Sequence, residues 1–106
     1  MLRIAVCFLG LIVAASASAQ DGGEVRRGQQ FAARVCAGCH ALDPGQTASP
    51  QADAPTFPVI AQVPGLTALA LTVSLQGAHR RMPDLVLETQ ERNDVIAFIL
   101  SLRRLN

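Results

Sequence analysis

The chain has 106 residues, a formal net charge of +1, three cysteines, four phenylalanines and neither tryptophan nor tyrosine. This length allows one domain, and the near-neutral charge without a basic tract argues against nucleic-acid binding, because the long-range attraction to phosphate is missing. All nine basic residues are arginines.

The first stretch has the features of a secretory leader. A short basic start, Met1 to Arg3, precedes an uncharged apolar run from Ile4 to Ala15, and a small-x-small site follows at Ala17-Ser18-Ala19. The run of about 12 residues is shorter than the ~20 that a spanning helix needs. We therefore predict a cleaved signal peptide over residues 1–19 and a periplasmic domain over residues 20–106. An uncleaved leader would instead tether the domain to a membrane.

The first helix is predicted over Glu24 to Val35, where apolar residues recur at helical spacing. Glu24 places negative charge near the positive end of the helix dipole. Gly28 lies inside this helix, where glycine costs about 1 kcal/mol relative to alanine. A close crossing by another helix would explain it.

The middle of the chain, from Ala41 to Pro64, contains five of the six prolines. No long helix can continue through such a stretch, and no alternating strand pattern occurs. Because long structureless loops are uncommon in compact domains, this segment is expected to wrap around something or to hold only short turns.

A second helix is predicted from Ala68 to Gln76, with Thr67 as its N-cap and Gly77 at its C-terminal end.

The third helix has the clearest pattern, with Thr89 as the predicted N-cap, Glu91 in the first turn and apolar residues recurring to Leu102. Arg103 and Arg104 follow at the negative end of the dipole. Three helices and no strand pattern predict an all-α fold.

Cys36-Ala37-Gly38-Cys39-His40 matches the attachment signature of c-type haem. Two thiols this far apart can each form a thioether with one haem vinyl group, and the adjacent His40 is then placed to bind the iron. The remaining cysteine, Cys7, belongs to the predicted leader. A covalent haem would also supply the interior that the 87 residues left after cleavage can hardly build alone.

Three other interpretations of the motif were weighed. A thioredoxin-like redox pair would require a βαβ context, which the chain lacks. A zinc site would need four ligands, and only Cys36, Cys39, His40 and His79 are available. A structural disulfide would close a very small loop and stabilise the chain little.

A sixth iron ligand is expected from elsewhere in the chain, and Met82 is the only methionine outside the leader. A thioether is a soft ligand that favours ferrous iron and raises the reduction potential. Met82 could instead fill a gap in the core, and His79 could replace it as the ligand, with a lower potential.

The chain resembles a small bacterial class I cytochrome c. The resemblance covers Gly28 to Leu102 and is carried by marks in the family's order, namely Gly28, the Cys36–His40 motif, Ala54-Pro55-Thr56-Phe57, Met82-Pro83 and Asp94-Val95-Ile96-Ala97-Phe98. It implies the cytochrome c fold, with three main helices and long loops around one covalently bound haem c.

The resemblance also implies roles for single residues. Cys36 and Cys39 would hold the haem, with His40 and Met82 as axial ligands. Pro55 would accept a hydrogen bond from Nδ1–H of His40, which orients the ring and increases its basicity. Phe57 would pack on the haem face.

Two further expectations concern packing and the haem propionates. Gly28 would lie at a helix crossing opposite Val95 and Phe98. Since the chain lacks Trp and Tyr, partners for the propionates must come from elsewhere, and Arg34, Arg80 and Arg81 are the candidates. The lysine-rich docking face of mitochondrial relatives is absent.

These observations favour a periplasmic one-electron carrier that binds redox protein partners transiently and has no small-molecule substrate or enzymatic activity. A dedicated cytochrome subunit of a larger periplasmic oxidoreductase would use the same chemistry with a permanent partner. A haem sensor, in which Met82 is displaced from the iron, is a third interpretation.

Overall fold

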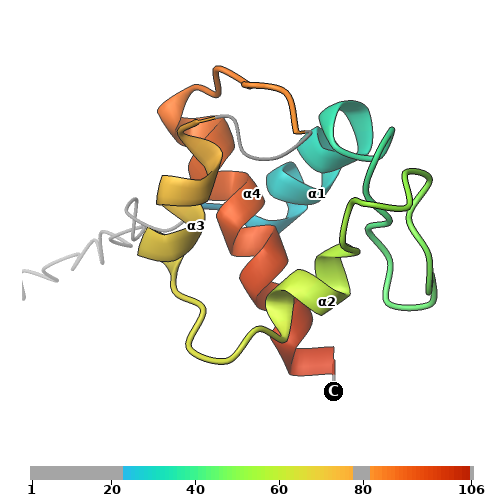
Figure 1. The fold of residues 1–106 in the computed structure, drawn as a ribbon. Coiled ribbons are helices and arrows are strands. Elements are labelled where there is room, and N and C mark those ends of the chain that lie inside the picture. The colour runs from blue at the N-terminus through green and yellow to red at the C-terminus, as the bar shows by residue number, and fades with distance from the viewer. Residues whose placement is uncertain (1–22, 78–81, 106) are drawn as a thin grey trace, which may run out of the picture.

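The computed structural model describes residues 23–77 and 82–105. Within them the chain forms α1 (Val25–Val35), α2 (Phe57–Ala61), α3 (Ala68–Leu75), α4 (Thr89–Ser101) and a 3-10 helix η1 (Leu102–Leu105), with no strand. The predicted all-α class and the three main helices are confirmed, and α2 is a short helix added in the proline-rich middle (Figure 1).

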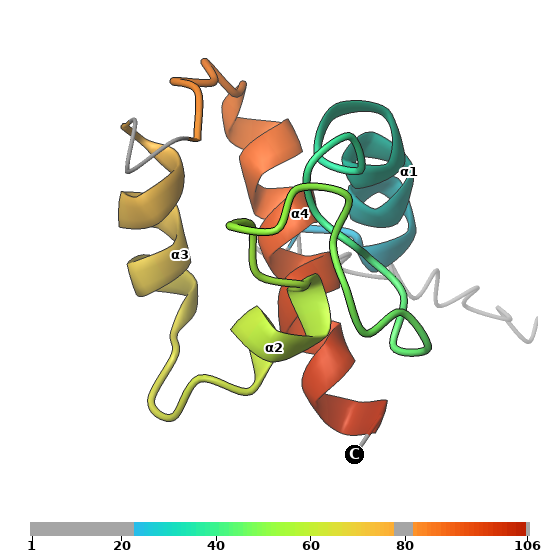
Figure 2. The ribbon, with the colours of Figure 1, turned by 45° about the vertical axis from the view of Figure 1, so that its right-hand side comes forward.

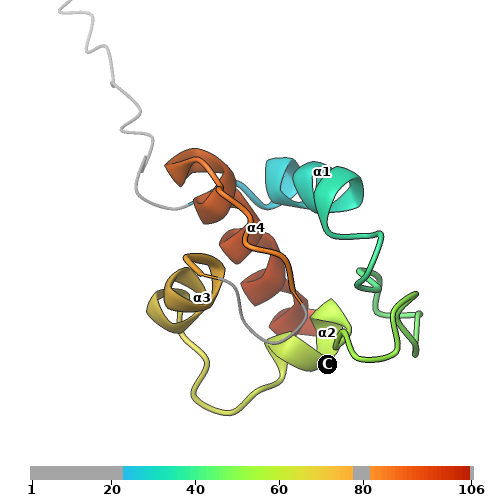
Figure 3. The same cartoon turned by 45° about the horizontal axis from the view of Figure 1, so that its top comes forward.

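The longest helix, α4, lies at the centre of the fold. In Figures 1, 2 and 3 it passes between α1 on one side and α3 on the other, and α2 lies beside its C-terminal part. Apolar side chains from all four α-helices, from η1 and from the loop after α1 form one core: Phe31, Ala32, Leu42, Phe57, Ala61, Leu71, Val95, Ile96, Phe98, Ile99 and Leu102. None of the helices in the described ranges is both long and apolar enough to cross a membrane.

The close helix crossing expected at Gly28 is present between α1 and α4. A Cβ atom at Gly28 would collide with the carbonyl group of Asp94 and would press against the Cβ of Phe98. Gly23, just before α1, is equally close to the backbone at Asn93. The two helices can approach this closely only because both positions lack a side chain.

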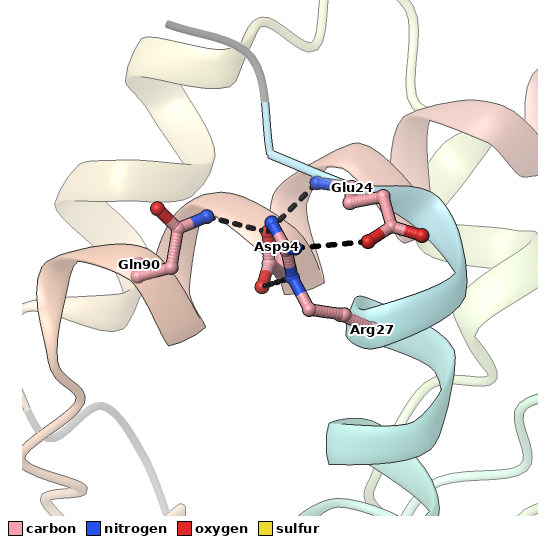
Figure 4. Close-up of polar contacts among 4 residues, drawn as sticks. All are labelled: Glu24, Arg27, Gln90 and Asp94. Atoms are coloured by element: carbon pink, nitrogen blue, oxygen red, sulfur yellow. Dashed lines mark hydrogen bonds and ion pairs between the residues drawn. The ribbon is translucent and has the colours of Figure 1, made fainter. Parts of the chain in front are cut away.

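A hydrogen-bonded cluster around Asp94 joins the start of α1 to α4 (Figure 4). The carboxylate of Asp94 accepts hydrogen bonds from the backbone N–H of Glu24 at 2.7 Å, from Nε of Arg27 at 3.0 Å and from Nε2 of Gln90 at 2.8 Å. Glu24 is the N-cap residue of α1 and has no side-chain cap bond of its own. Asp94 of α4 therefore provides the hydrogen-bond acceptor for a backbone N–H at the N-terminal end of α1.

Two opposing effects set the pKa of Asp94. Burial raises the pKa, because it disfavours the charged form, whereas the hydrogen bonds from Arg27, from the Glu24 backbone and from Gln90 lower it. The net result is a pKa below the ordinary value, so Asp94 is ionised at neutral pH.

The ends of the helices agree with the sequence at some positions and differ at others. Thr67 is the N-cap of α3, as predicted, and its Oγ1 accepts from the N–H of Ala70 at 3.0 Å. Thr89, predicted as the N-cap of the last helix, is its first residue instead. Glu88 is the cap and forms a capping box with Glu91, and this reciprocal pair replaces the threonine cap.

The C-terminal end of α4 also differs, because the α-helix stops at Ser101 and the chain tightens into η1 before the arginines. This change of pitch directs Arg103 toward α2. Its Nε donates to the carbonyl oxygen of Ala61 at 2.8 Å and its Nη2 donates to that of Leu66 at 2.7 Å. The guanidinium thus ties the loop between α2 and α3 to the end of the chain's last helix.

Candidate functional site

The haem-attachment motif begins where α1 ends. The N–H of Cys36, the C-cap residue, donates to the carbonyl oxygen of Ala32 at 2.8 Å. A hydrogen-bonded turn follows the helix, in which the N–H groups of Cys39 and His40 both donate to the carbonyl oxygen of Cys36, at 3.1 and 2.9 Å. This turn brings the two cysteines and the histidine of the motif together at one end of α1.

Both cysteines of the motif are free thiols and are half-buried. Burial raises the pKa of Cys36 to about 11, because the thiolate would lose its hydration. The same burial brings the Cys36 side chain against the apolar core.

The imidazole of His40 is oriented by a backbone carbonyl from across the loop. Its Nδ1 lies 2.6 Å from the carbonyl oxygen of Pro55, which is the contact that the resemblance implies. A carbonyl can only accept a hydrogen bond, so Nδ1 donates in this contact, and Nε2 is the ring nitrogen that Pro55 leaves unused. A histidine held in this way is typical of a metal-ligating imidazole.

Phe57 supports the same ring from a second direction. The centroids of the His40 and Phe57 rings are 5.4 Å apart with an interplanar angle of 54°, and Phe57 lies 6.0 Å from Phe98 of α4 in a similar tilted arrangement. The backbone N–H of Phe57 donates to the carbonyl oxygen of Ala41 at 2.9 Å. The buried Phe57 side chain thus connects the histidine to the centre of the fold.

Thr56 explains why a helix forms here at all, in a stretch where prolines argued against a long one. Its Oγ1 accepts from the N–H of Val59 at 3.2 Å, and Pro58 occupies the first turn, where its missing N–H does no harm. The result is a five-residue helix that positions Pro55 and Phe57 at its N-terminal end.

Two further hydrogen bonds hold the loop after the motif in place. Gln51 N–H donates to the carbonyl oxygen of Cys39 at 3.2 Å, and Ala41 N–H donates to Oγ of Ser49 at 3.0 Å. The loop therefore folds back on the motif.

The structure describes only some of the remaining residues that the sequence predicts for the site. Met82 is half-buried and starts the second described range, whereas His79, Arg80 and Arg81 lie outside the described residues. Arg34 is exposed in the last turn of α1. Among residues 23–77 and 82–105, no three histidine, cysteine, aspartate or glutamate side chains converge to hold a metal ion.

The structural roles of three residues, Thr56, Asp94 and Arg103, were not predicted from the sequence. Thr56 had a detectable signal, a threonine followed two residues later by proline, which is typical of a helix start. Asp94 was noted only as part of a family mark, although a carboxylate among buried apolar residues calls for donors nearby. The reach of Arg103 to Ala61 had no local signal, because the two residues are 42 positions apart.

Two comparisons with known proteins match this chain. The family model for cytochrome c matches residues 25–103. A curated protein of Bradyrhizobium diazoefficiens, strain USDA 110, named cytochrome c-552, is 35% identical over 98 residues, which cover 92% of each chain. No solved structure matches the chain.

Proposed function

This chain belongs to the cytochrome c family, and on that premise we propose that it is a periplasmic one-electron carrier with a single covalent haem c. The single observation that carries the proposal is the His40–Pro55 contact of 2.6 Å, directly beside two free thiols of the attachment motif. It supports a histidine prepared to bind iron at the position where a haem would be attached.

The donor set fits haem c in its chemistry. Cys36 and Cys39 provide two thiols in one turn, which suits thioether bonds to the two vinyl groups of a single porphyrin. His40 provides an imidazole whose Nε2 is left for another partner, because Nδ1 faces the carbonyl oxygen of Pro55. Met82, half-buried in the segment between α3 and α4, supplies a thioether sulfur.

We assign roles on this basis. Cys36 and Cys39 would hold the haem covalently, and His40 and Met82 would bind its iron. Pro55 and Phe57 orient the histidine. When bound, the haem supplies a one-electron couple between Fe(III) and Fe(II). With both His40 and Met82 bound to the iron, no position would be left for a substrate, and the chain would pass electrons to protein partners in brief contacts.

Covalent attachment is tested on the mature holoprotein made with a cytochrome maturation system. After denaturation and acid-acetone extraction, the polypeptide should keep its colour and stain for peroxidase activity on a gel, and its pyridine haemochrome should have the band positions of a haem with two thioethers. The Cys39→Ala variant should shift that band toward the position for one thioether. Colourless extracted protein would refute the proposal.

Export is tested separately. The mature protein should begin at Gln20 by mass spectrometry and should be released with the periplasmic fraction. A protein that keeps residues 1–19 and sediments with membranes would contradict the proposed location while leaving the haem chemistry intact.

A further inference from the structure

Arg103 of η1 binds the main chain around the C-terminal end of α2. Its Nε donates to the carbonyl oxygen of Ala61 at 2.8 Å, and its Nη2 donates to that of Leu66 at 2.7 Å and to that of Val63 at 3.5 Å. The planar guanidinium carries its donors in a fixed fork, so these bonds hold the end of α2 in one position relative to η1.

The sequence around Ala61 leaves its carbonyl group in need of such a donor. The last carbonyl groups of a helix have no partner within the helix, and Pro64, three residues after Ala61, has no N–H to donate. Ala61 is completely buried, so water does not replace the missing donor. Arg103 supplies it, and its positive charge also lies at the negative end of the α2 dipole.

The opposite end of α2 orients His40. The carbonyl oxygen of Pro55 lies 2.6 Å from Nδ1 of His40, and the ring of Phe57 packs beside the imidazole. With five residues, α2 is only about 7.5 Å long, so it moves as one unit. Phe57 and Ala61 lie four residues apart, on the same buried side of this helix. A displacement at Ala61 therefore reaches the two groups that orient the histidine.

We propose that Arg103 is a positioning residue for His40, which acts through α2 and helps to set the reduction potential. The inference rests on the proposed function, because it requires that Nε2 of His40 binds haem iron. Loss of the guanidinium would release the end of α2 and lengthen the contact between Pro55 and Nδ1. A weaker hydrogen bond at Nδ1 makes the imidazole a poorer electron donor, which stabilises Fe(III) less and raises the potential.

The direction of the potential change separates this effect from a simple loss of charge. Replacing an arginine with a neutral residue removes a positive charge, which by itself favours Fe(III) over Fe(II) and lowers the potential. Release of α2 has the opposite effect, because it raises the potential. Arg26→Gln removes the same charge from an exposed side chain on α1 and is the matched control.

The test uses the mature holoprotein with Arg103→Gln or Arg103→Lys. Because Arg103 is exposed, its replacement opens no cavity in the core. In Arg103→Gln we expect a higher midpoint potential and about tenfold faster solvent exchange of the His40 Nδ1 proton, measured by NMR on the reduced protein. Lysine keeps the charge but lacks the rigid fork, so Arg103→Lys should lie between Arg103→Gln and the parent in both measurements. Arg26→Gln should exchange like the parent, with a potential no higher than the parent's.

Two results would overturn the inference. The His40 Nδ1 proton of Arg103→Gln could exchange at the parent's rate, or the potential of this variant could stay level or fall as in Arg26→Gln. If only the free energy of unfolding decreases, Arg103 stabilises the fold without positioning the ligand. Either result in a variant with the parent's haem spectrum leaves the proposed function standing, whereas a parent protein without covalent haem refutes both.

Discussion

The His40 side chain is oriented by the protein itself, through a hydrogen bond and a ring contact. The carbonyl oxygen of Pro55 accepts from Nδ1 at 2.6 Å, and the ring of Phe57 packs beside the imidazole. Because both contacts come from the start of α2, a change at the N-cap Thr56 would alter the orientation of His40, the proposed iron ligand, without touching it. A carbonyl on Nδ1 also increases the electron density at Nε2, which strengthens a bond to iron.

Met82 is the residue whose role is tested most directly. In the Met82→Ala holoprotein we expect loss of the sulfur-to-iron absorption band near the red edge of the oxidised spectrum. We also expect a reduction potential lower by about 0.1 V or more, because thioether ligation favours ferrous iron. Spectroscopy and potentiometric titration measure the two effects.

The same experiment includes a control variant and tests the haem-sensor interpretation. Leu85→Ala, a half-buried neighbour in the same segment, should keep the band. Carbon monoxide should bind the reduced Met82→Ala variant but not the reduced parent. A band that survives in Met82→Ala would show that another residue is the ligand, and carbon monoxide binding to the parent would favour a sensor.

At the scale of helices, the α1–α4 crossing at Gly28 is the contact most sensitive to a single added methyl group. In an exposed helix, Gly→Ala stabilises by about 1 kcal/mol. At Gly28 the new Cβ would instead collide with backbone atoms of Asp94, which cannot rotate away. We expect Gly28→Ala to lower the free energy of unfolding by about 1–3 kcal/mol.

Denaturant unfolding of the holoprotein measures this loss. Gly45→Ala is the matched control, since a Cβ there meets no atom within 4 Å and the backbone angle suits alanine. Equal or greater stability of Gly28→Ala would mean that the helices do not cross this closely.

The Asp94 cluster predicts a specific pH dependence. The folded pKa of Asp94 is lower than the ordinary value of 3.8, so its stabilising contribution is complete above that pH and is lost as pH falls through the folded pKa. Asp94→Asn removes this carboxylate and leaves Arg27 with a weaker partner at the buried site. We expect a loss of about 1–3 kcal/mol at neutral pH.

The variant should also lose less stability than the parent protein as the pH is lowered below 3.8, because the group that titrates there is gone. Unfolding by urea at a series of pH values measures both effects. Asp84→Asn, on an exposed carboxylate, serves as the control. Parallel pH profiles for Asp94→Asn and the parent would contradict this role.

For the whole molecule, most of the fold was predicted from patterns that are local in the sequence. Apolar spacing located the three main helices, and the interior glycine at Gly28 pointed to the helix crossing. The short helix α2 was missed because its signal, a threonine cap with Pro58 in the first turn, was outweighed by the surrounding prolines. The capping box at Glu88 was missed because Thr89 is itself a good cap residue.

The candidate site was predictable to the extent that it is local in sequence. The motif names Cys36, Cys39 and His40 within five residues, whereas the orientation of His40 depends on contacts with Pro55 and Phe57, 15 and 17 positions away. The carbonyl of Pro55 was expected only through the family resemblance, and the ring contact with Phe57 emerged from the fold.

The small number of fully buried large side chains in the core leads to the last prediction. Val95 is the only large side chain in the described ranges that is less than 2% exposed, and several core members are alanines. A chain of this size with so small an interior is marginal without a staple or cofactor. We therefore expect Cys36→Ser/Cys39→Ser, which cannot hold haem covalently, to unfold on heating without a cooperative transition in far-UV circular dichroism.

Adding haem to this double variant separates loss of the cofactor from damage by the substitutions. Since His40 and Met82 are retained, non-covalent binding should restore part of the cooperative transition, and its midpoint should rise with haem concentration, because a ligand that binds only the folded state stabilises it by mass action. A haem-free variant that unfolds cooperatively at the temperature of the holoprotein would show that the polypeptide core suffices, and that the haem contributes redox chemistry but little of the stability.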